Sequence, residues 1–184
     1  MDDLEKNWKM YDSLCRRLED DNLNRLLDDL GERLVVSPSA GRTERGNAYP
    51  GGLVAELLEV TKSMRKINEA LEYGVSARSI LKVGLLHAIG KSGDLSNSYF
   101  LDQDNEWRRE TLEEYYKFNE SMPKMTHAHR TLWLLQQYGV SLDRDEWEAI
   151  SVGGGLHLVE NRFYSNSKSK ITKLLCSARQ LLPY

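Results

Sequence analysis

Apolar residues recur along this chain with the three-and-four spacing of an α-helix nearly throughout. The clearest case is residues 53–71, which read as one strong helix ending near "YGVS". Two earlier stripes predict helices over 8–18 and 23–30. Ser76 is suited to cap a following helix through "RSILKVGLLHAIG" (78–90). That segment is apolar on most faces, which predicts a central position in the fold.

The second half of the chain continues the helical pattern. Residues 106–118 ("EWRRETLEEYYKF") and 127–138 ("HAHRTLWLLQQY") are predicted helices, separated by "NESMPKM". The sequence "DRDE" (143–146) offers a capping box for another helix, which "VGGGL" then interrupts. An amphipathic helix over 169–182 closes the series.

Two segments break the helical period. Residues 35–52 contain two prolines and four glycines and predict a long ordered loop, and residues 91–106 are polar and loop-like. No segment predicts a strand. We therefore expect an all-α single domain, a helical bundle in which an N-terminal helical extension (1–34) packs on a helical domain (35–184).

Composition narrows the class of protein. The net charge of −3 over 184 residues gives no overall basic field for nucleic acid. No apolar stretch approaches the roughly 18–20 residues of a membrane span, and the acidic N-terminus is unlike a signal peptide. Cys15 and Cys176 are too few for a disulfide framework, so both are expected as buried thiols. A cytoplasmic protein is predicted.

Five segments in this order carry a family resemblance: "SPSAGRTERGNAYPGGLVAELLEV", "LLHAIGK", "THAHRTLWLL", "EWEAISVGGG" and "LLCSARQLL". Together they resemble the HD-domain phosphohydrolases, above all small phage and bacterial members, over about residues 37–182. The resemblance implies an HD-domain-like helical bundle. Its inner helices would offer His and Asp ligands to one or two divalent metals, which activate water to attack a phosphate ester.

Most of the implied metal ligands are replaced in this chain. His87 matches the histidine that names the family, but Ala88 stands in place of its aspartate. Val152 and Arg179 stand where a further histidine and the last aspartate are implied. Ala88 and Val152 carry no donor atom, and Arg179 is a permanent cation. We therefore predict no metal, no other cofactor and no catalytic residue.

What the resemblance leaves is a remnant pocket. Glu56 stands at the position of a first-helix histidine, and we expect it to pair with Arg179, directly or through water. Lys91 follows a helix end, where a lysine complements the helix dipole, and the resemblance implies a phosphate contact for it. Apart from the resemblance, His87 is expected to be a buried, hydrogen-bonded core residue, and His127 is expected to lie at the start of a helix. The predicted pocket residues are Glu56, His87, Lys91, His127 and Arg179.

Three functional interpretations remain open. The first is a catalytically inactive protein that binds a protein partner in a bacterial cytoplasm, or in the host cytoplasm if the chain is phage-encoded. The second is binding of a nucleotide-like ligand in the remnant pocket; the protein partner is preferred because few cations, Lys91, Arg179 and Arg42 or Arg45, are placed to meet phosphate. The third is a metal-dependent nucleotide phosphohydrolase with an atypical ligand set. That set would combine Glu56, His87 and His127 with Asp94 or Asp102.

Overall fold

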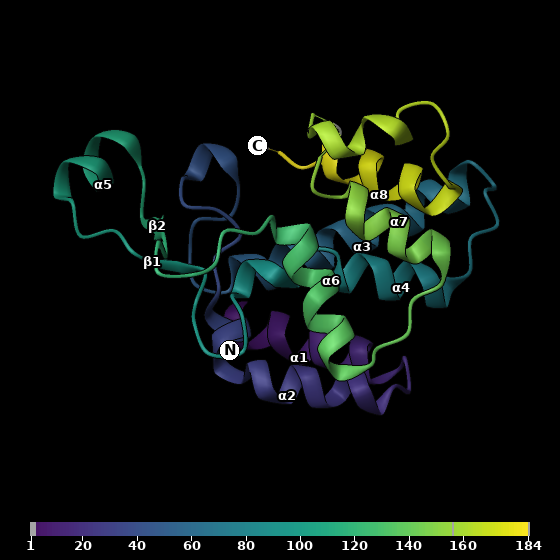
Figure 1. Ribbon diagram of the computed structural model, residues 1–184, viewed down its shortest axis with the longest axis horizontal. Helices are drawn as coiled ribbons and strands as arrows, with labels where there is room; N and C mark the ends of the chain where they lie inside the picture. The colour runs from purple at the N-terminus through teal and green to yellow at the C-terminus, as the bar shows by residue number, and fades with distance from the viewer. Residues whose placement is uncertain (1–2, 156, 184) are drawn as a thin grey trace.

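The fold is mostly helical, as Figure 1 shows for the computed structural model, which describes residues 3–155 and 157–183. The prediction of an all-α single-domain fold is confirmed. The α-helices are α1 (Asp3–Arg16), α2 (Asp21–Val36), α3 (Gly52–Ala70), α4 (Ala77–Leu86), α5 (Glu106–Leu112), α6 (His127–Tyr138), α7 (Arg144–Val152) and α8 (Lys170–Gln180). Short 3₁₀ segments are η1 (Thr43–Arg45), η2 (Ile89–Ser92) and η3 (Val159–Tyr164), and two strands are β1 (Phe100–Asp102) and β2 (Tyr116–Phe118).

The helices form a body around α3 and α4, which lie side by side. Helices α1 and α2 cover one side of this pair, and α7 and α8 cover the opposite side (Figure 1). Helix α6 contacts both α2 and α7, so it joins the two sides. A segment of residues 99–118, here called the arm, stands out from the body and contains β1, α5 and β2 (Figure 1).

The core consists of two hydrophobic clusters that meet at α3 and α4. The larger cluster takes side chains from α1, α2, α3, α4 and α6, and the smaller one from α3, α4, α7 and α8. The N-terminal residues contribute fully to this core, because Tyr11 is buried and its hydroxyl donates a hydrogen bond to the Leu85 carbonyl at 3.0 Å. Helix α2 runs to Val36, across the predicted boundary at residue 34.

The predicted helix caps are confirmed. The Ser76 hydroxyl accepts a hydrogen bond from the Ser79 amide at the start of α4. Asp143 and Glu146 form the predicted capping box at α7, in which each side chain accepts from the backbone amide of the other residue. These contacts satisfy amides that the first helical turn leaves without partners.

The arm corrects two predictions. Helix α5 ends at Leu112, so the predicted helix over 106–118 is wrong in its second half, and β2 takes its place. Strand β2 pairs antiparallel with β1, with Phe100 opposite Phe118, inside a region expected to have no strand. The Phe100 and Phe118 rings stack with centroids 5.4 Å apart. Cross-strand aromatic contacts of this kind stabilise the pairing of two short strands, although the sequence pattern of this region favours a helix.

None of the helices in the described part of the chain is both long and apolar enough to cross a membrane.

Candidate functional site

The site lies where α3, η2, α6 and α8 meet, and close backbone contact creates it. Gly90 is buried in η2, and its amide donates to the Thr131 hydroxyl on α6 at 2.9 Å. A Cβ on Gly90 would lie 2.7 Å from the Thr131 amide nitrogen and still closer to the His127 carbonyl oxygen. Only glycine allows this approach, which sets Lys91 beside the start of α6.

We expect Gly90→Ala to lower the free energy of unfolding by about 3 kcal/mol, the upper end of the usual range for overpacking, because both neighbours are backbone atoms. Urea unfolding followed by circular dichroism measures the change. Gly74→Ala is the comparison, since Gly74 has a φ of +70° with open space around it, and there we expect only backbone strain of about 1 kcal/mol. Equal effects at the two glycines would contradict the close approach.

The structure brings the five predicted pocket residues together. Their charges act on one another: those of Glu56, Lys91 and Arg179 influence both histidines, and His87 influences His127. His87 ends α4 and is fully buried, His127 begins α6, and Arg179 lies in the last turn of α8. Their proximity is a structural observation, whereas their role in binding stays a prediction.

Glu56 is paired differently from the prediction. Its carboxylate lies 2.9 Å from the Lys91 ammonium, and both side chains are nearly buried. Lys91 thus forms the ion pair with Glu56 that the sequence analysis assigned to Arg179. Burial acts to raise the pKa of Glu56, but the Lys91 ammonium and hydrogen bonds from Ser39 and Lys91 outweigh it and lower the pKa to about 2.

The two histidines are held neutral. Burial, followed by the nearby Arg179 guanidinium, lowers the pKa of His87 to about 3. Burial and the Lys91 ammonium lower the pKa of His127 well below its ordinary value. The His87 Nδ1 lies 3.0 Å from the Gly84 carbonyl oxygen, which can only accept a hydrogen bond, so Nδ1 carries the proton.

A cleft opens beside these residues, between the arm and the helical body. It has a volume of about 750 Å³, and Lys91 and His127 form part of its floor. An adjoining hollow of about 360 Å³ reaches Glu56 and Arg179. The two share four lining residues, Arg45, Lys91, Gly154 and His157. They therefore adjoin one another beside the predicted pocket residues, and the two together are here called the depression.

The lining of this depression combines cationic and aromatic side chains. The described residues that line it include six cations and two carboxylates, although the whole chain is acidic. The cations are Arg42, Arg45, Lys91, Arg108, Lys117 and Arg179, and the carboxylates are Glu56 and Glu114. The four aromatic rings of the lining all come from the arm: Tyr99, Phe100, Tyr116 and Phe118.

Sequence reasoning missed the contribution of the arm. It named Arg42 and Arg45, which the loop before α3 brings to the cleft, but not Arg108 or Lys117. The run "SYF" at 98–100 and the run "YYKF" at 115–118 are rich in strand-forming aromatic residues, and that composition was the available signal. Trp107, on α5 of the arm, is exposed.

The residues of the site do not fit the divalent metal that the family resemblance implies. Ala88 and Val152 are completely buried and provide no donor. Lys91 and Arg179 place two cations where a metal would need negative ligands. Across the described residues, no three or more His, Cys, Asp or Glu side chains gather in a way that could hold a metal ion.

The positions of Asp94 and Asp102 do not support the atypical set of metal ligands that would include one of them. The Asp94 carboxylate accepts hydrogen bonds from the amides of Ser96 and Asn97 within its own loop. Asp102 is exposed on β1 in the arm. Neither aspartate lines the depression that contains Lys91 and Arg179.

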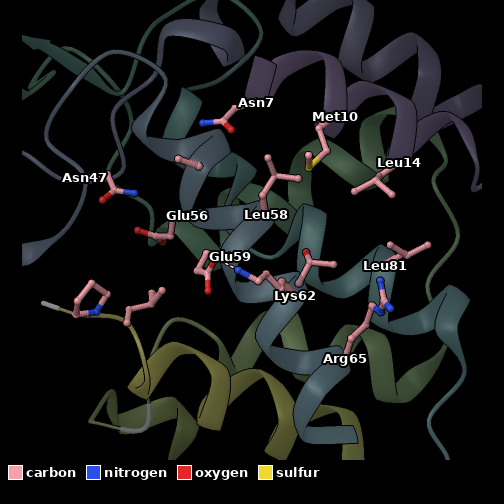
Figure 2. A pocket seen from close by; sticks show the side chains of 14 residues that line it. Asn7, Met10, Leu14, Asn47, Glu56, Leu58, Glu59, Lys62, Arg65 and Leu81 are labelled. Atoms are coloured by element: carbon pink, nitrogen blue, oxygen red, sulfur yellow. Dashed lines mark hydrogen bonds and ion pairs between the residues drawn. The ribbon is translucent and has the colours of Figure 1, made fainter. Parts of the chain in front are cut away.

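A separate hollow of about 680 Å³ lies between α1, α3 and the C-terminal segment. Figure 2 shows Asn47 and Glu56 on one side of it and Leu81 and Arg65 on the other. Its lining is largely apolar, with Met10 and Leu58 among the side chains. Glu56 borders both this hollow and the cationic depression, so its carboxylate forms part of the wall between them.

Comparison with protein families, with curated proteins and with solved structures finds no match to this chain.

Proposed function

We propose that this protein is a binding protein without catalytic turnover, whose ligand is a nucleotide-like molecule held in the depression between the arm and the helical body. The supporting observation is the lining, which sets six cations beside four aromatic rings. A nucleotide combines the two matching groups, because its phosphates are anionic and its base has a planar face that stacks on aromatic side chains. This ligand was the second choice from sequence, and the cations of the arm are the reason to prefer it.

The proposed absence of turnover is supported by the chemistry of the site. The buried positions Ala88 and Val152 provide no metal ligand, and the Glu56 carboxylate is engaged by the Lys91 ammonium. Hydrolysis of a phosphate ester by this kind of bundle requires a metal-bound water. The proposal therefore includes the HD-domain resemblance as a similarity of fold. The position of the bound ligand is retained, and the metal-dependent chemistry is lost.

The experiment is titration of the purified protein with AMP, by calorimetry and in the presence of a chelator. AMP should bind, and no phosphate should be released when Mn²⁺ is added instead of the chelator. Phe118→Ala should weaken AMP binding about 5- to 150-fold, the usual range for loss of one base-stacking contact. Phe118 is 60% exposed, so its removal leaves the body intact.

Trp107→Ala is the matched control, because Trp107 belongs to the same arm but lies outside the depression. It should leave AMP affinity unchanged. Absence of AMP binding, or equal losses in the two variants, would contradict the proposal.

A protein partner is the second candidate, supported by the exposed apolar side chains of the arm. Trp107 is 61% exposed, and Leu101 and Tyr115 are also exposed. Substituting Trp107 should then weaken capture of the partner from a bacterial lysate, while Phe163→Ala, at a similarly exposed position outside the arm, should not. This test uses the full chain, since α1 and α2 supply much of the larger core cluster.

A further inference from the structure

Three nitrogen atoms in the site are buried without a hydrogen-bond partner in the described part of the chain. They are His87 Nε2, His127 Nε2 and Arg179 Nε. Buried polar atoms of folded proteins nearly always have a partner, so three such atoms from three helices need a common explanation. Arg179 and His127 line the two halves of the depression, and Lys91 lines both. His87 lines neither half, but it lies buried behind them, close enough for its charge to interact with those of Arg179, Lys91 and His127.

The hydrogen-bonding roles of these atoms differ. Because the His87 Nδ1 carries the proton that it shares with the Gly84 carbonyl, Nε2 of the neutral ring holds a lone pair and can only accept. Arg179 Nε and the Lys91 ammonium can only donate. A group that satisfies them together must donate one hydrogen bond to His87, accept others, and carry negative charge.

Few chemical groups meet all three conditions. A divalent metal would satisfy the His87 lone pair but would be repelled by Lys91 and Arg179. Sulfate carries charge but no proton near neutral pH. A singly protonated phosphate has one P–OH to donate, other oxygens to accept, and a negative charge.

We propose that His87, His127, Arg179 and Lys91 form a site for one singly protonated phosphate group, in the place where the resembled family would hold a metal. This inference deepens the proposed function, since it names the part of the nucleotide-like ligand that the buried end of the depression recognises. The shared chemistry is a phosphate monoester, either free or as part of a nucleotide.

The surroundings of His87 set the pH dependence. The charged or titratable groups that face it are Glu56 from α3, Lys91 from η2, His127 from α6 and Arg179 from α8. Two other helices packed on α4 carry titratable groups that already have partners. The Tyr11 hydroxyl on α1 donates to the Leu85 carbonyl, and Glu146 on α7 is paired with Lys82. The bound proton resides between the ligand and His87 Nε2, so binding above the ligand's pKa requires proton uptake.

The first test uses glycerol 3-phosphate as a monoester without a base, and sulfate as the proton-free control. Calorimetry between pH 6 and 8, with a chelator present and circular dichroism to confirm folding, gives both affinities. The monoester should bind at least about tenfold more tightly than sulfate, roughly the effect of one charge-assisted hydrogen bond. Its affinity should fall toward tenfold per pH unit above the phosphate's second pKa of about 6, as uptake of one proton requires. Equal binding of sulfate, or affinity independent of pH, would overturn the inference.

The second test separates this inference from the proposed function. Arg179→Gln and His127→Gln should each weaken binding of glycerol 3-phosphate and of AMP at least about tenfold. Arg65→Gln, an exposed cation on α3 outside the depression, should change neither. Phe118→Ala should weaken AMP alone. AMP binding that is unaffected by Arg179→Gln and His127→Gln overturns the phosphate site while the function stands. Binding of glycerol 3-phosphate without AMP overturns the function while the site stands.

Discussion

Lowering the pH from 7 to about 4.5 is expected to destabilise the fold by about 3 kcal/mol through His87 alone. The pKa of His87 is about 3 in the folded chain against 6.5 for an unperturbed histidine, because the ring is completely buried near Arg179. Between these values the unfolded chain binds a proton that the folded chain does not. The stabilisation is therefore complete above pH 6.5 and is lost as the pH falls toward 3, at about 1.4 kcal/mol per pH unit.

Other groups act in the same direction. The lowered pKa of His127, caused by burial and Lys91, adds to the loss below pH 6.5. Glu56, with a pKa of about 2 instead of 4.5, loses its stabilising charge as the pH falls further. Urea unfolding at a series of pH values measures the slope. His129→Gln, at an exposed histidine, should leave it unchanged, and a stability that is flat between pH 7 and 5 would show that His87 is not buried and neutral.

Glu56→Gln is expected to lower the free energy of unfolding by about 3–5 kcal/mol, the usual effect of removing one partner of a buried ion pair. The Lys91 ammonium, 12% exposed, would then face a neutral amide in place of the carboxylate 2.9 Å away. The matched control is Glu59→Gln, one turn further along α3. Glu59 pairs with Lys62 at 3.3 Å with both side chains exposed, so its loss should change stability by less than about 1 kcal/mol.

A double-mutant cycle completes this experiment. Adding Lys91→Met to Glu56→Gln removes the stranded charge, so the double variant should recover part of the lost stability. Urea unfolding of the four proteins gives the coupling energy. A double variant that is as unstable as the sum of the two single variants would show that Lys91 and Glu56 do not interact.

The helical body could be predicted from sequence because its signals are local. Buried stripes at three-and-four spacing mark α1, α2 and α3, and cap residues such as Ser76 and Asp143 mark where α4 and α7 begin. The arm could not be predicted in the same way. Its strands have three residues each, and α5 is followed by Glu113 with a φ of +47°, an unusual conformation that no sequence signal announces.

The sequence named residues that the structure places near one another, but it did not give all their contacts. Family resemblance placed Glu56, His87 and Arg179 together, and opposite charge made the pairing of Glu56 with Arg179 attractive. In the structure, Glu56 pairs with Lys91. Lys91 is in position because Gly90 lets η2 approach α6 closely, so the pair depends on the placement of α3, η2 and α6 together. Local sequence patterns do not report such a three-way meeting, nor the depression that the arm completes.

The attachment of the arm has a consequence for the order of folding. The Gly41 carbonyl accepts hydrogen bonds from the amides of Tyr115 and Tyr116, and Arg42 forms an ion pair with Glu114, 72 positions further along the chain. Closing so long a loop costs entropy, which the body offsets by burying its core, whereas no residue of α5 in the arm is buried. We therefore expect the helical body to form first and the arm to dock last, so the cleft between them is the final part of the molecule to form.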